Sequence, residues 1–148
     1  MVFSEVQSGS RPMIYAILAF MVLLAIIEYI VVPVGAKMAV SLIMSIILGL
    51  VATMLFGFNL ETKIDAKNIS LKIPVLLKTK IAVADIISAE QFSYSPLRDF
   101  GGWGIRYGKG GIMYNANGNQ SVKLVMKDGK IIYIGTQKPE ALINALGK

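Results

Sequence analysis

Cysteine and histidine are both absent from this 148-residue chain. Without them, the chain alone cannot build a disulfide framework, a zinc finger, a cysteine nucleophile or a Ser-His-Asp triad. Charge is scarce too: 16% of the residues are charged and 55% are hydrophobic, whereas a soluble domain has about 25% charged residues. This composition argues against an ordinary water-soluble protein, and the net charge of +6 favours an anionic partner or a membrane surface.

Two long apolar runs account for the shortage of charge. Residues 13–34 contain one ionisable side chain, Glu28, and residues 38–58 contain none. Because about 20 apolar residues in a helix span the bilayer core, both runs are predicted to be transmembrane helices. The link between them contains Pro33 and Gly35-Ala36-Lys37, and a link this short forces the helices to run antiparallel. Both termini are then expected on one side of the membrane.

Basic residues are concentrated on the terminal side of the two runs. Arg11 precedes the first run, and the link contains only Lys37. Five lysines follow the second run: Lys63, Lys67, Lys72, Lys78 and Lys80. The positive-inside rule predicts a cell-membrane protein with both termini in the cytoplasm and residues 1–12 as a cytoplasmic segment. These lysines either attract anionic lipid or form a solvated face that only fixes the topology.

After the second run, hydrophobic side chains alternate with polar ones, which is typical of half-buried strands. Turn-forming residues separate the segments. Eight strands are predicted, at residues 60–64, 69–73, 77–82, 86–93, 103–107, 111–115, 121–126 and 131–135. Pro139 then starts a helix with Leu142, Ile143 and Leu146 on one face. Residues 60–148 are therefore expected to form a separate domain of about seven or eight antiparallel strands and one C-terminal helix.

Four stretches of this domain occur in a characteristic order: Tyr94-Ser95-Pro96, Phe100 to Arg106 (FGGWGIR), Gly129-Lys130 and Ile134 to Glu140 (IGTQKPE). Together they resemble the small prokaryotic PH-like domains that follow a pair of membrane helices. The resemblance covers residues 60–147. It implies a membrane α-helical hairpin plus an all-β PH-like barrel or sandwich with one C-terminal helix. It implies no reaction, because PH-like barrels serve many functions.

A ridge of small residues runs along the second apolar segment. Its members are spaced by four and are Ser41, Ser45, Gly49, Thr53 and Gly57. Small side chains at this spacing let helix backbones approach closely in a membrane. Two interpretations stand: the ridge is an interface with another subunit, or it packs on the chain's own first helix.

Glu28 is the ionisable residue inside an apolar run, and such residues are expensive in a membrane and often functional. It lies near the end of its run, so we expect its carboxylate to reach lipid headgroups or Lys37. The alternative is a proton or ion path that Glu28 shares with partner subunits.

The FGGWGIR stretch contains Gly101, Gly102, Trp103 and Gly104. Its spacing is not that of a phosphate-binding loop, and no clear helix follows it. We expect the glycines to allow a tight bend, with Trp103 packed nearby. Arg106 is expected to pair with Asp99 or to bind a lipid headgroup.

The carboxylates show no paired-acid or metal-ligand spacing. The sequence therefore favours a protein that is not an enzyme, with no cofactor, no metal and no nucleic-acid partner. We hypothesise a scaffold or accessory subunit of a membrane complex, or a homo-oligomer, with membrane lipids as further partners. The alternatives are an anionic-lipid-binding or lipid-sensing module, and a transporter or membrane-enzyme subunit that contributes Glu28.

Overall fold

The computed structural model describes residues 2–9, 11–57, 59–74 and 76–147, with side chains except at 11–13 and 53–57. The chain divides into two compact units. One unit is Gly9–Gly57, and the other joins Met1–Ser8 to Phe58–Lys148. Each is described by itself below.

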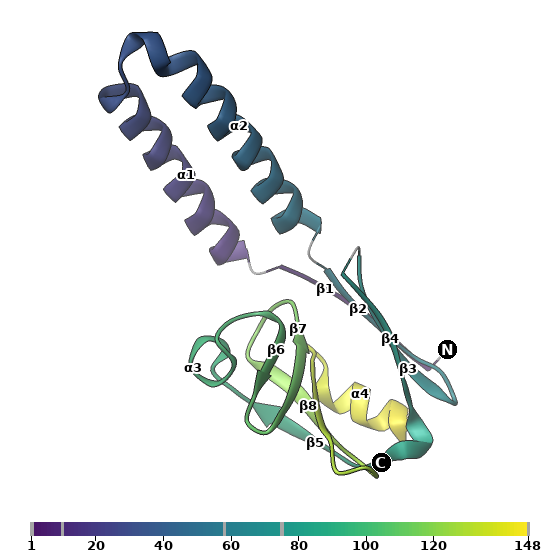
Figure 1. Ribbon diagram of the computed structural model, residues 1–148. Helices are drawn as coiled ribbons and strands as arrows, with labels where there is room; N and C mark the ends of the chain where they lie inside the picture. The colour runs from purple at the N-terminus through teal and green to yellow at the C-terminus, as the bar shows by residue number, and fades with distance from the viewer. Residues whose placement is uncertain (1, 10, 58, 75, 148) are drawn as a thin grey trace. The chain divides into compact units, whose positions relative to one another are not determined.

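The first unit is an antiparallel pair of helices, α1 (Arg11–Val31) and α2 (Val34–Gly57) (Figure 1). Both are long and apolar enough to cross a membrane. Only Val32 and Pro33 separate them, so α2 begins earlier than predicted and Gly35-Ala36-Lys37 forms its first turn rather than the link. Pro33 directly precedes α2, where proline is tolerated because the first N–H groups of a helix have no partner inside the helix.

In the second unit, the first sheet contains four antiparallel strands in the order β1-β2-β3-β4. They are β1 (Phe3–Ser8), β2 (Asn59–Ile64), β3 (Asn68–Ile73) and β4 (Leu77–Ala82). The last three match predicted strands, whereas β1 lies in the segment expected only to precede the membrane. Ser8 pairs directly with Asn59, so the whole helical hairpin is inserted between two neighbouring strands of one sheet.

The second sheet contains five strands in the order β5-β8-β9-β7-β6. They are β5 (Ile86–Ser93), β6 (Gly104–Gly108), β7 (Gly111–Asn115), β8 (Gln120–Met126) and β9 (Ile131–Gly135). The prediction of antiparallel pairing is wrong for one pair, because β7 and β9 run parallel. Successive strands reverse direction here, so β7 and β9, separated in sequence by β8 alone, point the same way.

Three short helical segments complete the second unit. A 3-10 turn (Val83–Asp85) connects the sheets, α3 (Pro96–Phe100) joins β5 to β6, and α4 (Pro139–Leu146) follows β9. The C-terminal helix is confirmed, and it lies against β5, β8 and β1 (Figure 1). Leu142 and Leu146 are buried, and Ile143 packs against the same core.

One hydrophobic core joins both sheets and α4. Burial of apolar side chains is the dominant favourable term in folding, and here each sheet contributes one face. The largest fully buried apolar side chains of this core are Leu60, Ile64, Ile69, Leu71, Ile73, Ile86, Leu124, Ile134, Leu142 and Val122. A second, smaller cluster of the second sheet and α3 contains Tyr94, Phe100, Met113 and Tyr133. The second unit is thus a mostly β domain of two sheets closed by a C-terminal helix.

Candidate functional site

The outer face of the first sheet carries four of the five predicted lysines. Leu60, Thr62 and Ile64 of β2 point into the core, so the alternation of a strand turns Lys63 and Glu61 outward. The same alternation exposes Lys72, Lys78 and Lys80 on β3 and β4. Together with Ser70 these residues line a shallow cavity of about 200 Å³. We call this surface, defined by Lys63, Lys72, Lys78 and Lys80, the basic face.

Register arranges the basic face in two rows across the sheet. The first row is Val6, Glu61, Lys72 and Lys78, and the second is Ser4, Lys63, Ser70 and Lys80. Lys72 and Lys78 are direct cross-strand partners, an arrangement that is destabilising for like charges. One acid lies in the rows: Glu61, which forms an ion pair with Lys63. The hydrogen bond within this pair, from the Lys63 ammonium to the Glu61 carboxylate, lowers the pKa of Glu61. With four lysines and one acid, the basic face keeps a net positive charge.

Lys67 does not belong to the basic face, contrary to the expectation of one five-lysine cluster. It lies in the turn between β2 and β3, where its backbone N–H donates to Asp65 at 2.8 Å. The N–H of Asn68 donates to the same carboxylate oxygen at 2.8 Å. These two donors lower the pKa of Asp65, and they show Asp65 acting as the turn former that the sequence suggests.

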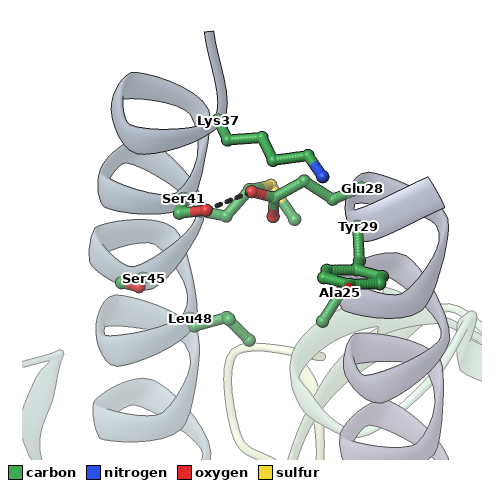
Figure 2. A pocket seen from close by; sticks show the side chains of 8 residues that line it. Ala25, Glu28, Tyr29, Lys37, Ser41, Ser45 and Leu48 are labelled. Atoms are coloured by element: carbon green, nitrogen blue, oxygen red, sulfur yellow. Dashed lines mark hydrogen bonds between the residues drawn. The ribbon is translucent and has the colours of Figure 1, made fainter. Parts of the chain in front are cut away.

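Glu28 has its partner within the hairpin. Ser41 of α2 donates a hydrogen bond of 2.5 Å to the Glu28 carboxylate of α1, and Figure 2 shows both side chains pointing between the helices (Figure 2). Lys37 lies over the ring of Tyr29, with its ammonium nitrogen 4.6 Å from the ring centre. Among the described ion pairs none joins Lys37 to Glu28. A contact with Ser41 therefore takes the place of the expected pair with Lys37.

These polar groups lie around a cavity of about 270 Å³ between α1 and α2. Its remaining wall is formed by Ala25, Met44, Ser45 and Leu48. A polar group removed from water needs a hydrogen-bond partner. The Ser41 contact supplies one to Glu28 inside the chain, which favours a packing role for this carboxylate over an ion path.

Two members of the small-residue ridge face the chain's own first helix. Ser41 and Ser45 line the cavity between the helices, whereas a Cβ added to Gly49 would have nothing within 4 Å. The side chains of Thr53 and Gly57 lie outside the described residues. A four-residue step advances about 40° beyond one full helical turn. The half-buried residues Val40, Met44 and Leu48 follow the same step, so the ridge runs beside them along α2.

The FGGWGIR stretch forms a structural loop around a buried polar network. Gly101 ends α3 in the left-handed conformation (φ 70°), and Gly102 and Gly104 also have positive φ, which favours glycine. Trp103 donates from its indole N–H to the carbonyl of Gly118 at 3.2 Å. The stretch therefore bends tightly and anchors Trp103, as the sequence analysis expects.

Asn115 organises the interior of this loop. Its side-chain oxygen accepts the N–H of Gly104 at 2.8 Å, and its amide donates to the hydroxyl of Tyr94 at 2.5 Å. Asn115 is fully buried, so each of these bonds satisfies a group that cannot reach water. Burial raises the pKa of Tyr94. Neither Asn115 nor its contact with Tyr94 could be expected from the sequence, because Asn115 stands in no recognisable catalytic or capping pattern.

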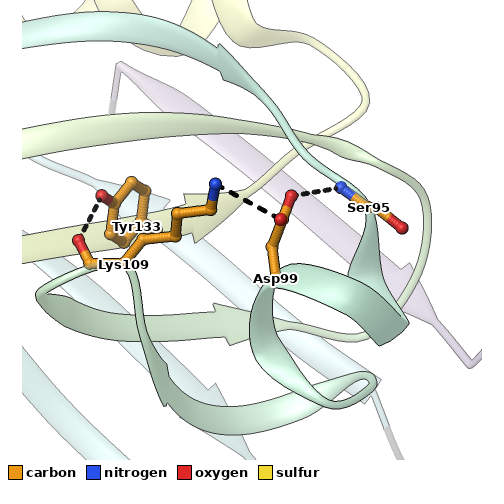
Figure 3. Close-up of polar contacts among 4 residues, drawn as sticks. All are labelled: Ser95, Asp99, Lys109 and Tyr133. Atoms are coloured by element: carbon orange, nitrogen blue, oxygen red, sulfur yellow. Dashed lines mark hydrogen bonds and ion pairs between the residues drawn. The ribbon is translucent and has the colours of Figure 1, made fainter.

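Asp99 pairs with Lys109, not with Arg106 as expected. Lys109 lies 3.3 Å from the Asp99 carboxylate, whose other oxygen accepts the N–H of Ser95 at 2.8 Å (Figure 3). Both contacts lower the pKa of Asp99, the Ser95 N–H most. The hydroxyl of Tyr133 donates to the Lys109 carbonyl at 3.1 Å, which holds this turn in place. Arg106 is exposed.

A second missed set of contacts connects β1 to the end of β9. Glu5 accepts hydrogen bonds from the Thr136 hydroxyl and from the N–H of Gln137, the latter at 2.7 Å. Gln7 is buried beside them and accepts the N–H of Ala116 at 3.4 Å. These contacts join the two sheets through polar side chains of β1.

In the described part of the chain, no group of three or more acidic side chains lies close enough together to hold a metal ion. Two candidate binding sites have been described above: the basic face and the cavity beside Glu28. In comparisons with protein-family models, curated proteins and solved structures, no match to this chain was found.

Proposed function

We propose that this chain is a non-enzymatic membrane protein: a two-helix anchor that carries a cytoplasmic PH-like domain and acts as a scaffold or accessory subunit. One observation carries the proposal. The helical hairpin is inserted between β1 and β2, which are paired along their whole length. The β domain is thereby tied to the anchor through two neighbouring strands, and a domain with two tethers keeps a more restricted orientation than one on a single linker.

Two features support the PH-like identity and the cytoplasmic location. The second unit has two sheets and a C-terminal helix, which is the plan implied by the resemblance. The lysines that follow α2 outnumber the basic residues near the turn between the helices, which favours a cytoplasmic domain. A reporter fused after Lys148 is expected to be active only in the cytoplasm, and activity restricted to the outer side would refute this topology.

Assembly is the test of the scaffold proposal. The tagged chain is crosslinked in its native membrane, extracted in a mild detergent and purified, and the co-eluting proteins are identified by mass. We expect either a stoichiometric membrane partner or a homo-oligomer. A monomer that crosslinks to nothing, while the hairpin is inserted and the domain is folded, would contradict the proposal.

Binding of anionic lipid is the second candidate function, and the basic face favours it. Four lysines share one surface with a single acid, and a basic surface beside a membrane attracts anionic lipid. Purified full-length protein in vesicles of phosphatidylcholine with one quarter phosphatidylglycerol is expected to enrich the anionic lipid around itself. Lys72→Glu is expected to reduce this enrichment and Lys67→Glu to leave it unchanged. Equal effects of the two changes would mean that the basic face has no specific part in it.

A further inference from the structure

The turn between β3 and β4 lies at the end of the first sheet where the chain leaves for the membrane helices. Glu61 pairs with Lys72, and Ile64 pairs with Ile69. The end of β3 therefore lies beside the start of β2, and Ile73 pairs there with Leu77 of β4. Ser8 and Asn59, the last sheet residues on either side of the hairpin, occupy the same end.

Covalent geometry keeps this end of the sheet close to the bilayer. The last residue of α2, Gly57, is two peptide units from Asn59, so their Cα atoms are at most about 7.6 Å apart. Ser8 is three peptide units from Arg11 at the start of α1, a reach of about 11 Å. If α1 and α2 span a membrane, these two short links connect Ser8 and Asn59 to the helix ends at its surface.

The chemistry of the turn suits a membrane surface. Leu76 is 59% exposed, and Pro74 beside it is exposed too. Lys72 and Lys78 flank the turn as direct cross-strand partners. An apolar tip between cations combines the two attractions that bind a peripheral segment to a bilayer, burial of apolar surface and attraction to anionic lipid.

We propose that the β3–β4 turn is a membrane-contacting element, in which Leu76 enters the headgroup layer and Lys72 and Lys78 bind the phosphates of anionic phospholipids. The inference rests on the proposed membrane anchor and adds a defined point of contact to the lipid-binding candidate. It also explains the pairing of two lysines across the sheet, because a phosphate between them relieves the repulsion that they otherwise exert on each other. The second row, with Lys63 and Lys80, lies about 7 Å further from the tip.

Single-cysteine labelling tests the contact directly, because the chain has no cysteine of its own. Three full-length variants, Leu76→Cys, Leu97→Cys and Leu50→Cys, carry a nitroxide spin label in vesicles of phosphatidylcholine with one quarter phosphatidylglycerol. Leu97 is the matched control, since it is a 70% exposed leucine of the same domain, in α3. Leu50 of α2 reports insertion of the hairpin. Collisions with oxygen and with a water-soluble nickel complex give the depth of each label.

We expect the label at residue 76 to be shielded from nickel, the label at 97 to remain in water and the label at 50 to lie in the acyl core. In Leu76→Cys, adding Lys72→Gln and Lys78→Gln is expected to lower the ratio of inserted to free turn about 30-fold. That factor corresponds to about 1 kcal/mol for each lysine. Lys67→Gln, at the opposite end of the sheet, is expected to leave the ratio within twofold.

Three results would overturn the inference. If the label at 76 is as accessible to nickel as the label at 97 while the label at 50 is inserted, the anchor stands and the turn contact is wrong. If the label at 50 is also in water, the anchor itself fails. If the label at 76 is equally shielded in vesicles of phosphatidylcholine alone, anionic phosphates have no part in the contact and the role given to Lys72 and Lys78 is wrong.

Discussion

Replacing residues 9–58 with the dipeptide Asn-Gly is expected to convert this chain into a water-soluble, folded β domain. Ser8 and Asn59 are direct partners in an antiparallel pair. Such a pair is closed by a two-residue turn, for which Asn-Gly has the strongest preference. This protein, the linked domain, keeps β1 and its contacts with Thr136 and Gln137. By contrast, residues 59–148 alone lose β1 and leave the edge of β2 uncovered.

The expected difference between these two proteins follows from what β1 buries. Phe3 is 9% exposed and belongs to the core that joins both sheets. Truncating a buried phenylalanine costs about 3–5 kcal/mol, against a total stability of about 5–15 kcal/mol for a domain. The Glu5 hydrogen bonds are lost in addition. Residues 59–148 alone are therefore expected to be unfolded or loosely packed.

Urea unfolding followed by circular dichroism measures the effect. With a denaturant slope of about 1–3 kcal/mol per molar urea, loss of Phe3 alone is expected to lower the unfolding midpoint by at least about 1 M. Phe3→Ala in the linked domain serves as the intermediate case, and Val6→Ala, an exposed position on the same strand, serves as the matched control. Equal midpoints for the linked domain and for residues 59–148 would show that β1 is not an integral part of the sheet.

Three further changes test other parts of the structure. Leu146→Asp places a charge in the core beneath α4, which is expected to cost several kcal/mol of stability and to lower the melting temperature. Asn144→Asp, on the exposed side of the same helix, is expected to change the melting temperature little. Equal melting temperatures for the two variants would mean that α4 does not pack there. Gly49→Leu adds a bulky side chain to the small-residue ridge, where close helix packing needs small residues, so it is expected to weaken crosslinking between subunits while the hairpin stays inserted. Leu50→Phe is expected to do much less, and unchanged crosslinking would place any interface elsewhere. The lowered pKa of Asp99 stabilises the fold at pH values above the ordinary carboxyl pKa, and this contribution is lost as the pH falls through the lowered value. Asp99→Asn is therefore expected to reduce stability at pH 7 and to flatten the decline of stability in acid. An unchanged dependence of stability on pH would refute the stabilising role of the Asp99 carboxylate.

Much of the β domain could be predicted because its strands have one buried and one exposed face. In β3, for example, Ile69, Leu71 and Ile73 are buried and alternate with polar residues, which is the period-two pattern itself. Strand β1 could not be found in this way. Its inward-facing positions are Phe3, Glu5 and Gln7, and two polar residues that bond to the other sheet interrupt the hydrophobic alternation.

The sequence could predict which residues belong to the candidate sites, but not which of them lie side by side. Lys67 is closer to Lys63 in sequence than the other members of the predicted cluster are, yet only register decides which lysines share a face. The sequence suggests that Arg106 pairs with Asp99 or binds a lipid headgroup, whereas the turn after β6 brings Lys109 to Asp99. In both cases the deciding contact depends on strand pairing, which a pattern of residue types does not specify.

The insertion of the hairpin between β1 and β2 has a consequence for the order of events during synthesis. Strand β1 leaves the ribosome before the two helices, and its partner β2 leaves only after both helices have been made. Until then Phe3 has no core to enter, and Glu5 lacks its partners at Thr136 and Gln137. Closing so long a loop in a flexible chain costs entropy, whereas two antiparallel helices already inserted in a bilayer hold their ends together. If α1 and α2 enter a bilayer, their insertion would lower the entropic cost of pairing β1 with β2 and so assist completion of the first sheet.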